Sequence, residues 1–256
     1  MKKATLEATD ENILGLIREQ EKDSDRNQEI IEFIEGLERI DENKFISLDA
    51  RWGEGKTFYV RQIEKTLEYQ TLNYFKKEAE DDENVQGELK KLESYFKGTE
   101  LEKQIITHSY LPIYYDAWLY DNHSDPLMSL LLVISKKCRQ NIDTTRDRKL
   151  SERFGELLSS FSFGLQFMKG GQISIDGQKA INAFKDIDIL EEIKTAEEIR
   201  TTVKQLLKEV PVEQAEKLVI FIDELDRCKP SYALEMLERI KHYFDDNRII
   251  FIVSVN

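Results

Sequence analysis

The fold is decided by the stretch Phe45-Ile46-Ser47-Leu48-Asp49-Ala50-Arg51-Trp52-Gly53-Glu54-Gly55-Lys56-Thr57, an apolar run that leads into a glycine-containing turn and ends on Lys-Thr. A loop that binds phosphate must curl tightly and point several backbone N–H groups inward, which residues without a side chain permit. Gly53 and Gly55 meet that demand. The helix expected after the loop would direct the positive end of its dipole at the anion. The stretch therefore predicts a strand, a phosphate-binding loop and a helix.

The loop also supplies the side chains that we expect to hold a nucleotide. Lys56 would reach the β- and γ-phosphates, and Thr57 would offer its hydroxyl to Mg²⁺. The match to the pattern G-x-x-x-x-G-K-[ST] is imperfect, because Ala50 stands where the first glycine is expected. The alternative interpretation is a strand-to-helix turn with a solvated lysine. The expected nucleotide-binding residues of the loop are Arg51, Trp52, Gly53, Glu54, Gly55, Lys56, Thr57 and Phe58.

Composition limits the class of protein. The 256 residues are 40% apolar and 34% charged, as in an ordinary globular chain, and the economical prediction is a single α/β domain. The formal charge of −13 argues against a primary role in binding the nucleic-acid backbone. Cys138 and Cys228 have no metal-ligand spacing and are too few for a disulfide framework, which favours the cytoplasm. No apolar run approaches the roughly 20 residues that span a bilayer, so we expect no transmembrane segment.

Alternating helical and strand patterns divide the chain into two parts. Between about residues 10 and 40, apolar residues at helical spacing predict two helices, and these form an N-terminal unit, residues 1–43, that packs on the core. The core, residues 44–256, is predicted to contain the strand Lys44–Leu48, a helix from Phe58 to about Leu72, the strand Leu111–Trp118, a helix opening at Asp125-Pro126 and a helix Ile193–Val210.

Two insertions are expected in this core. The strongly charged stretch at about 76–105 predicts a solvated helical insertion. At about 151–180, phenylalanine and leucine alternate with small or polar residues before a Gly-Gly turn, which is typical of a β-hairpin. The apolar side chains of such a hairpin must be buried, either against their own domain or against a partner or a membrane surface.

A second apolar run ends in acids and reads Lys217-Leu218-Val219-Ile220-Phe221-Ile222-Asp223-Glu224-Leu225-Asp226-Arg227. It has the Walker B pattern, that of a parallel strand buried on both faces whose carboxyl end carries function. Asp223 would hold Mg²⁺ through its water shell, and Glu224 would orient or deprotonate the attacking water. Because small-molecule kinases generally need no base directly after the metal-binding aspartate, this acid pair favours ATP hydrolysis. The alternative is a turn whose carboxylates cap the next helix.

The end of the chain predicts one more helix and one more strand. Pro230 is expected to begin a helix through Leu234, Leu237, Ile240 and Phe244, and Ile249–Asn256 to form a buried strand. Asp226 and Arg227 would pair and cap that helix, or Arg227 would face phosphate or a neighbouring subunit. In additional-strand P-loop ATPases the last strand lies between the two motif strands and its polar tip senses the γ-phosphate, which makes Asn256 a candidate sensor.

Three segments together resemble the KAP family of P-loop NTPases, namely Ala50–Thr57, Tyr115-Asp116-Ala117-Trp118 and Ile222–Pro230. The likeness extends from about residue 26 to the end of the chain. It implies a nucleotide-hydrolysing switch, often membrane-associated, and in some bacterial members a part in excluding phage. Two features depart from the family, since many members carry paired transmembrane helices and a leading loop glycine. The last strand should also lie within the sheet, so we expect a fragment that lacks a C-terminal lid.

The prediction is therefore a three-layer α/β P-loop NTPase of the additional-strand type, with a mainly parallel sheet, helices on both faces and an inserted β-hairpin. It would bind ATP and Mg²⁺, with Lys56 and Glu224 as catalytic residues and Thr57 and Asp223 as metal ligands. We expect a protein partner or self-association and no direct nucleic-acid binding, and peripheral membrane contact stays open. The alternatives are a nucleotide-gated assembly module with little turnover, and an interaction protein whose site has decayed.

Overall fold

A computed structural model of the chain describes residues 6–19, 25–42, 44–51, 53–75, 83–123, 125–140, 152–153, 200–210 and 215–255. The described elements are, in chain order, α1 (Asp10–Glu19), α2 (Arg26–Glu38), β1 (Lys44–Asp49), α3 (Lys56–Phe75), α4 (Glu83–Phe96), α5 (Glu100–Lys103), β2 (Tyr110–Asp116), η2 (Trp118–Tyr120), α6 (Pro126–Gln140), β3 (Lys217–Asp223), η3 (Leu225–Arg227), α10 (Pro230–Tyr243) and β4 (Ile249–Val255). A further helical stretch covers residues 200–210. The predicted hairpin at 151–180 and the first part of the helix predicted at 193–210 lie outside the described residues, apart from 152–153.

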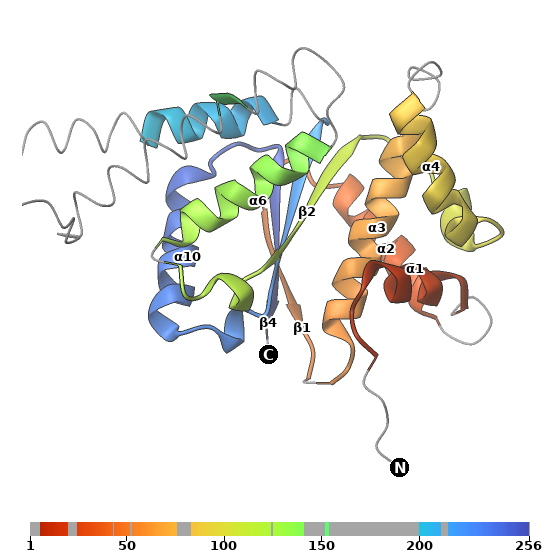
Figure 1. Cartoon of the computed structure of the whole chain (residues 1–256), viewed down its shortest axis with the longest axis horizontal. Helices are drawn as coiled ribbons and strands as arrows, with labels where there is room; N and C mark the ends of the chain where they lie inside the picture. Colours follow the sequence, from red (N-terminus) through yellow and green to blue (C-terminus); the bar gives the residue numbers. More distant parts are fainter. Residues whose placement is uncertain are drawn as a thin grey trace, which may run out of the picture.

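The strands form one parallel sheet in the order β1-β4-β3-β2. The last strand in the chain, β4, pairs with β1 on one side and with β3 on the other. It therefore lies between the strand that precedes the phosphate loop and the strand that ends in acids, which confirms the predicted additional-strand arrangement (Figure 1). Because all of these strands run in the same direction, their carboxyl ends meet at one edge of the sheet.

Helices cover both faces of the sheet, as a three-layer fold requires. Figure 1 shows α3 with α1, α2 and α4 on one side, and α6 and α10 on the other. Alternate residues of β3 point to opposite faces, so that Leu218, Ile220 and Ile222 belong to one apolar cluster while Val219 and Phe221 belong to the second. Every residue of β3 is buried, as expected of a central parallel strand.

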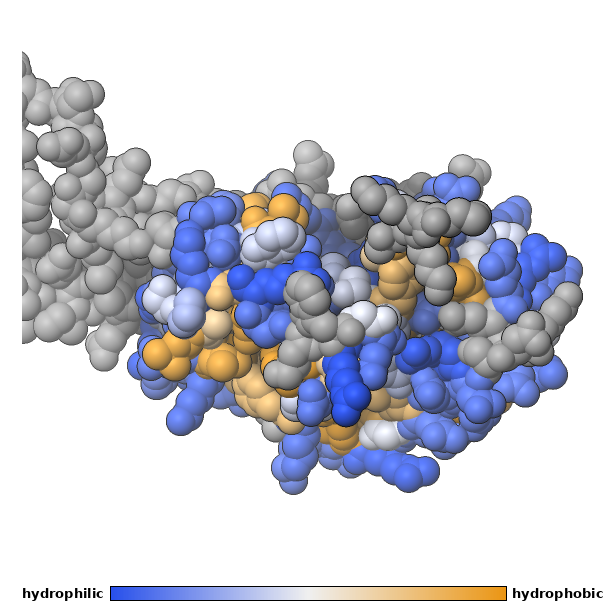
Figure 2. All heavy atoms as spheres, turned by 90° about the horizontal axis from the view of Figure 1, so that it is seen from below, coloured by the Kyte–Doolittle hydropathy of each residue, from blue (hydrophilic) through white to orange (hydrophobic). Residues whose placement is uncertain are grey.

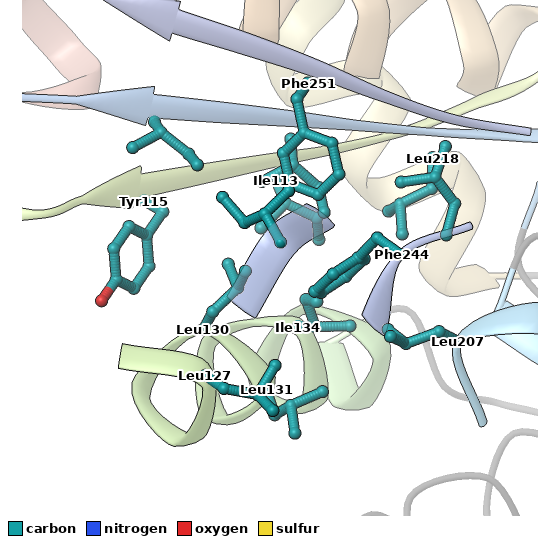
Figure 3. Close-up of a cluster of buried hydrophobic side chains, with 14 of the residues drawn as sticks. Ile113, Tyr115, Leu127, Leu130, Leu131, Ile134, Leu207, Leu218, Phe244 and Phe251 are labelled. Atoms are coloured by element: carbon teal, nitrogen blue, oxygen red, sulfur yellow. The ribbon is translucent and has the colours of Figure 1, made fainter. Parts of the chain in front are cut away.

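The cluster beneath α6 and α10 shows how the second face is filled (Figure 3). Apolar side chains of α6 point toward strand residues such as Ile113 and Leu218, and Phe251 meets the ring of Phe244 edge to face at a centroid distance of 5.1 Å. The α6 side chains in this layer are Leu127, Leu130, Leu131 and Ile134. Pro126 begins the helix as predicted, and the Asp125 carboxylate accepts the free N–H groups of its first turn.

Helix α10 forms where it was predicted, but its buried face differs from the leucines that indicated it. Leu234 and Leu237 are 61% and 41% exposed, whereas Tyr232, Met236 and Ile240 are buried. The Tyr232 hydroxyl lies 2.6 Å from that of Tyr115 on β2, a buried polar contact on the side of the helix that faces the sheet. The side of α10 that faces the sheet is therefore the one with buried side chains at every fourth position, Tyr232, Met236 and Ile240.

The predicted second strand also ends earlier than its apolar run. β2 stops at Asp116, whose side chain accepts the N–H of Leu119 and so supports the 3₁₀ turn η2. Trp118, predicted as the last residue of the strand, is exposed at this turn, as is the neighbouring Leu119.

The charged stretch at 76–105 contains α4. This helix buries Leu89 and Phe96 and is therefore not solvated on all sides.

An ion pair crosses the β2 edge of the sheet. Lys137 of α6 contacts Glu68 of α3 at 2.8 Å, and Glu68 also contacts Lys65. Because α3 and α6 cover opposite faces, this pair joins the two outer layers past the edge strand. Although burial raises it, the ammonium groups of Lys137 and Lys65 bring the pKa of Glu68 below its ordinary value.

We predict that Glu68→Gln lowers the free energy of unfolding at pH 7 by about 1–2 kcal/mol, because two partly buried ammonium groups lose their shared partner. A carboxyl whose pKa is lowered on folding stabilises the protein above its unfolded pKa, and that contribution is lost as the pH falls through the lowered folded value. The difference between variant and wild type should therefore shrink below about pH 4. Urea unfolding at a series of pH values measures it. Glu88→Gln, which removes an exposed pair with Lys91, serves as control and should change little at any pH.

Candidate nucleotide-binding site

The phosphate loop connects β1 directly to α3 and has the backbone that its glycines permit. Gly53 and Gly55 have φ values of +86° and +82°, which residues with a Cβ rarely adopt. The loop is closed by two contacts between the same residues, because the N–H of Arg51 donates to the Glu54 carboxylate at 2.9 Å and the N–H of Glu54 donates to the Arg51 carbonyl at 3.2 Å. The carbonyl of Gly55 accepts the first helical hydrogen bond, from the N–H of Tyr59.

The side chain of Lys56 ties this loop to the end of β4. Its ammonium group donates to the carbonyl of Val255 at 2.6 Å. The candidate sensor Asn256 follows immediately in the chain, but it lies outside the described residues, as does Trp52 within the loop. Two residues before Asn256, the buried hydroxyl of Ser254 has no hydrogen-bond partner in the described part of the chain. The carboxyl end of β4 thus places polar groups beside the loop.

Asp223 ends β3 as a buried carboxylate with a donor on each oxygen. It is 2% exposed. Its Oδ1 accepts the N–H of Glu224 at 3.0 Å, and its Oδ2 accepts the hydroxyl of Tyr114 at 3.1 Å. Sequence reasoning did not single out Tyr114. The signal that would have found it is the pairing of β2 with β3, which sets Asp116 opposite Asp223 and brings Tyr114 diagonally beside it.

Glu224 has the backbone conformation that sets it apart from its neighbours. Its φ of 59° and ψ of 23° place it in the left-handed region. Among the described residues, it is the one residue other than glycine with a positive φ. Such a conformation costs of the order of 1–3 kcal/mol and persists where the surroundings enforce it. Here the turn directs the side chain back over the loop, where Thr57 donates its hydroxyl to Glu224 Oε1 at 3.4 Å.

The second oxygen of the Glu224 carboxylate contacts the guanidinium of Arg227. That guanidinium in turn lies over the ring of Trp118, at 5.6 Å from its centroid. Burial raises the pKa of the Glu224 carboxyl, Arg227 opposes the shift, and the nearby carboxylate of Asp223 adds to it. A carboxyl with a raised pKa is a better proton acceptor than an ordinary surface carboxylate.

The structure brings the two motifs together. Thr57 and Glu224 are separated by 167 positions in the chain and meet at the carboxyl edge of the sheet. Of the other loop residues, Arg51 and Glu54 are exposed, and Phe58 is half-buried at the start of α3. Figure 2 looks at the molecule from the side on which β4 ends and shows hydrophilic side chains interrupted by hydrophobic ones.

Together the parallel sheet, the glycine loop and the acid-tipped strand define a P-loop NTPase. Residues 26–256 match the family model described as the KAP family P-loop domain, and the chain therefore belongs to this family of nucleotide-binding proteins. A search among curated proteins found none that matches. Within the described residues, no helix has the length and the apolar content that crossing a bilayer demands.

We predict that Gly55→Ala destabilises the ligand-free protein by about 1–2 kcal/mol, because alanine at this φ carries a backbone penalty. No heavy atom lies within 4 Å of the position of an added Cβ, so the penalty comes from the backbone and not from a clash. Thermal unfolding measures it. Gly36→Ala is the matched control, since Gly36 lies in α2 with equally open space and ordinary helical geometry. This control should raise stability by up to about 1 kcal/mol, and equal effects of the two substitutions would contradict the assigned loop conformation.

Proposed function

We propose that the chain binds Mg²⁺–ATP, hydrolyses it, and uses the cycle as a conformational switch. The observation that carries the proposal is the contact between Thr57 of the loop and Glu224 of the acid turn. It joins a group suited to the metal and the phosphates to a group suited to activating water. Both residues lie at the same edge of the sheet, which is the placement that a hydrolytic site requires.

The loop is the proposed phosphate site. Its two left-handed glycines leave the loop backbone open to a close-lying anion, and α3 begins at Lys56 with the positive end of its dipole toward that space. In the proposed complex the Lys56 ammonium exchanges its contact with the Val255 carbonyl for the β- and γ-phosphates. The nucleotide would be held by Arg51, Trp52, Gly53, Glu54, Gly55, Lys56, Thr57 and Phe58, with Asn256 beside the γ-phosphate.

Thr57 and Asp223 fit a magnesium site in their chemistry. Mg²⁺ prefers oxygen ligands and keeps several waters when it binds proteins with a nucleotide. The Thr57 hydroxyl donates its proton to Glu224 and so keeps its lone pairs for a cation, while Asp223 is a buried carboxylate that directly precedes Glu224 at the end of β3. When bound, the metal would neutralise charge on the phosphates.

Glu224 is the proposed general base. Its raised pKa suits proton abstraction, and its left-handed backbone fixes the direction of the side chain over the loop. Arg227 neutralises the carboxylate in the ligand-free chain. A water-activating role requires that the carboxylate accept a proton, so the Arg227 contact must weaken before turnover. In the proposed switch, the Arg227 contact with Glu224 is present without nucleotide and weakens before hydrolysis.

One observation favours a second candidate, a nucleotide-gated assembly module with little turnover. Both oxygens of Glu224 are already engaged, by Thr57 and by Arg227. If Arg227 stays in place when nucleotide binds, the chain would change conformation or partner without rapid hydrolysis. The partner would be another protein or a second copy of the chain, acting in the cytoplasm or at a membrane surface.

We predict that Mg²⁺–ATP stabilises the wild-type chain, by about 2.7 kcal/mol at a concentration of 100 times Kd. Lys56→Ala should abolish this stabilisation, because the loop loses its only lysine ammonium. Glu224→Gln should bind as wild type does and lose turnover by roughly 10²–10⁴-fold, the usual effect of a general base. Thermal unfolding and phosphate release measure the two effects, and Lys97→Ala, an exposed lysine, is the control.

The outcomes separate the candidates. Binding without turnover in the wild type supports the assembly module. The absence of any stabilisation by nucleotide contradicts both candidates and favours an interaction protein with a decayed site. The proposal of a role in excluding phage rests on the family and is tested by infecting cells that carry wild type or Lys56→Ala, where only wild type should protect.

A further inference from the structure

Tyr114 lies on the strand beside the metal-binding acid and on the same face. β2 and β3 pair so that Tyr114 is opposite Phe221 and Asp116 is opposite Asp223. Side chains two positions apart on neighbouring strands are within reach of one another when one is a long aromatic. The Tyr114 hydroxyl uses this geometry to donate to Asp223 Oδ2 at 3.1 Å.

The contact completes the fixation of the Asp223 carboxylate. The Glu224 N–H holds Oδ1 and the Tyr114 hydroxyl holds Oδ2, so that the plane of the carboxylate is set by a donor on each side. Each carboxylate oxygen can accept two hydrogen bonds, and the donors among the described residues use one on each, which leaves the other for the water shell of a cation. A tyrosine hydroxyl carries its proton near neutral pH and a carboxylate has none to give, so Tyr114 is the donor in this contact.

Tyr114 is itself held from the opposite side by Arg61 of α3. The guanidinium carbon lies 4.4 Å from the ring centroid, in a cation–π arrangement. Arg61 is fixed in turn by the carboxylates of Glu64, one turn along the same helix, and of Asp10 at the start of α1. Asp10 also contacts Lys65 at 3.0 Å. A chain of contacts therefore leads from α1 through Arg61 and Tyr114 to Asp223.

We propose that Tyr114 is a positioning residue for Asp223, which presents the carboxylate to Mg²⁺ in a fixed orientation, and that Arg61 holds the phenol in place for this task. The inference rests on the proposed function, because it requires Mg²⁺ to bind with the nucleotide. Tyr114 touches neither metal nor nucleotide in this proposal. The hydrogen bond from Tyr114 is expected to lower the Mg²⁺ concentration at which the site is half occupied.

The test is a Mg²⁺ titration at a fixed, saturating ATP concentration, followed by the thermal unfolding midpoint. Tyr114→Phe removes the hydroxyl and keeps the ring under Arg61. We expect the Mg²⁺ concentration at half-maximal stabilisation to rise by about three- to tenfold, in line with the loss of one hydrogen bond to a charged group. In EDTA, where the phosphate loop alone binds, the shift produced by ATP should equal that of wild type.

Tyr110→Phe is the matched control. Tyr110 lies four residues earlier on the same strand and face, and its hydroxyl also donates to a carboxylate, that of Glu38. It should lose stability without ligand and keep the wild-type Mg²⁺ dependence. A merely structural role of Tyr114 would give the same result as this control, and the inference would then be wrong.

A second variant tests the support for the ring. Arg61→Lys keeps a charge for Asp10 and loses the planar group over Tyr114, and we expect a smaller rise in the Mg²⁺ requirement in the same direction. A wild-type chain whose stabilisation by ATP is independent of Mg²⁺ would overturn the proposed metal site and this inference together. A Mg²⁺-dependent wild type with unchanged Tyr114→Phe would overturn the role of Tyr114 alone.

Discussion

The pairing of β4 with both β1 and β3 is the constraint on which the site depends. Backbone hydrogen bonds fix β4 between strands that lie far apart in the chain, and they set the separation of the loop from the acid turn at two strand spacings. The Lys56 ammonium on the Val255 carbonyl shows that this central strand also reaches the loop with its own end. β3 and β4 are buried by apolar layers on both faces, as central parallel strands are.

The electrostatics of the edge follow from that arrangement. Asp116 and Asp223 end neighbouring strands opposite one another, and Glu224 and Asp226 follow in the next turn. Strands that run in parallel gather these acids in one place, where their negative charge attracts cations. Burial, together with the carboxylates of the neighbouring aspartates, raises the pKa of Glu224. Arg227 and Lys56 bring cationic groups to this edge, one beside each half of the site.

Much of this could be predicted from the sequence, because the signals were local. Glycines before Lys-Thr, an unbroken apolar run before Asp-Glu and a proline after Asp125 each specify a backbone conformation within a few residues. The position of β4 followed from the type of fold that the two motifs imply. Failures arose where the outcome depends on a neighbour. Leu234 and Leu237 are as apolar as Met236, yet the side of the helix that faces the sheet is the one that carries Tyr232, in contact with Tyr115, and Met236.

The site shows the same division. The loop and the acids were predicted as a set, and the structure places Thr57 and Glu224 in contact. The contacts of Tyr114 with Asp223 and of Arg227 with Glu224 depend on strand register and on the left-handed turn at Glu224, which no periodicity in the chain encodes. Residues that carry the chemistry can be identified from motifs in the sequence. The residues that orient them can be identified only once the register between paired strands is known.

The contact of Asp10 with Arg61 joins a helix outside the family match to residues inside it. The family match starts at residue 26, whereas α1 precedes it and buries Ile13 and Ile17 against the helices of the core. A boundary drawn by family resemblance would cut away the carboxylate that restrains Arg61. The stretch that matches the family model is thus shorter than the packed structure, because α1 lies outside that stretch and its Asp10 contacts Arg61, the residue over the ring of Tyr114.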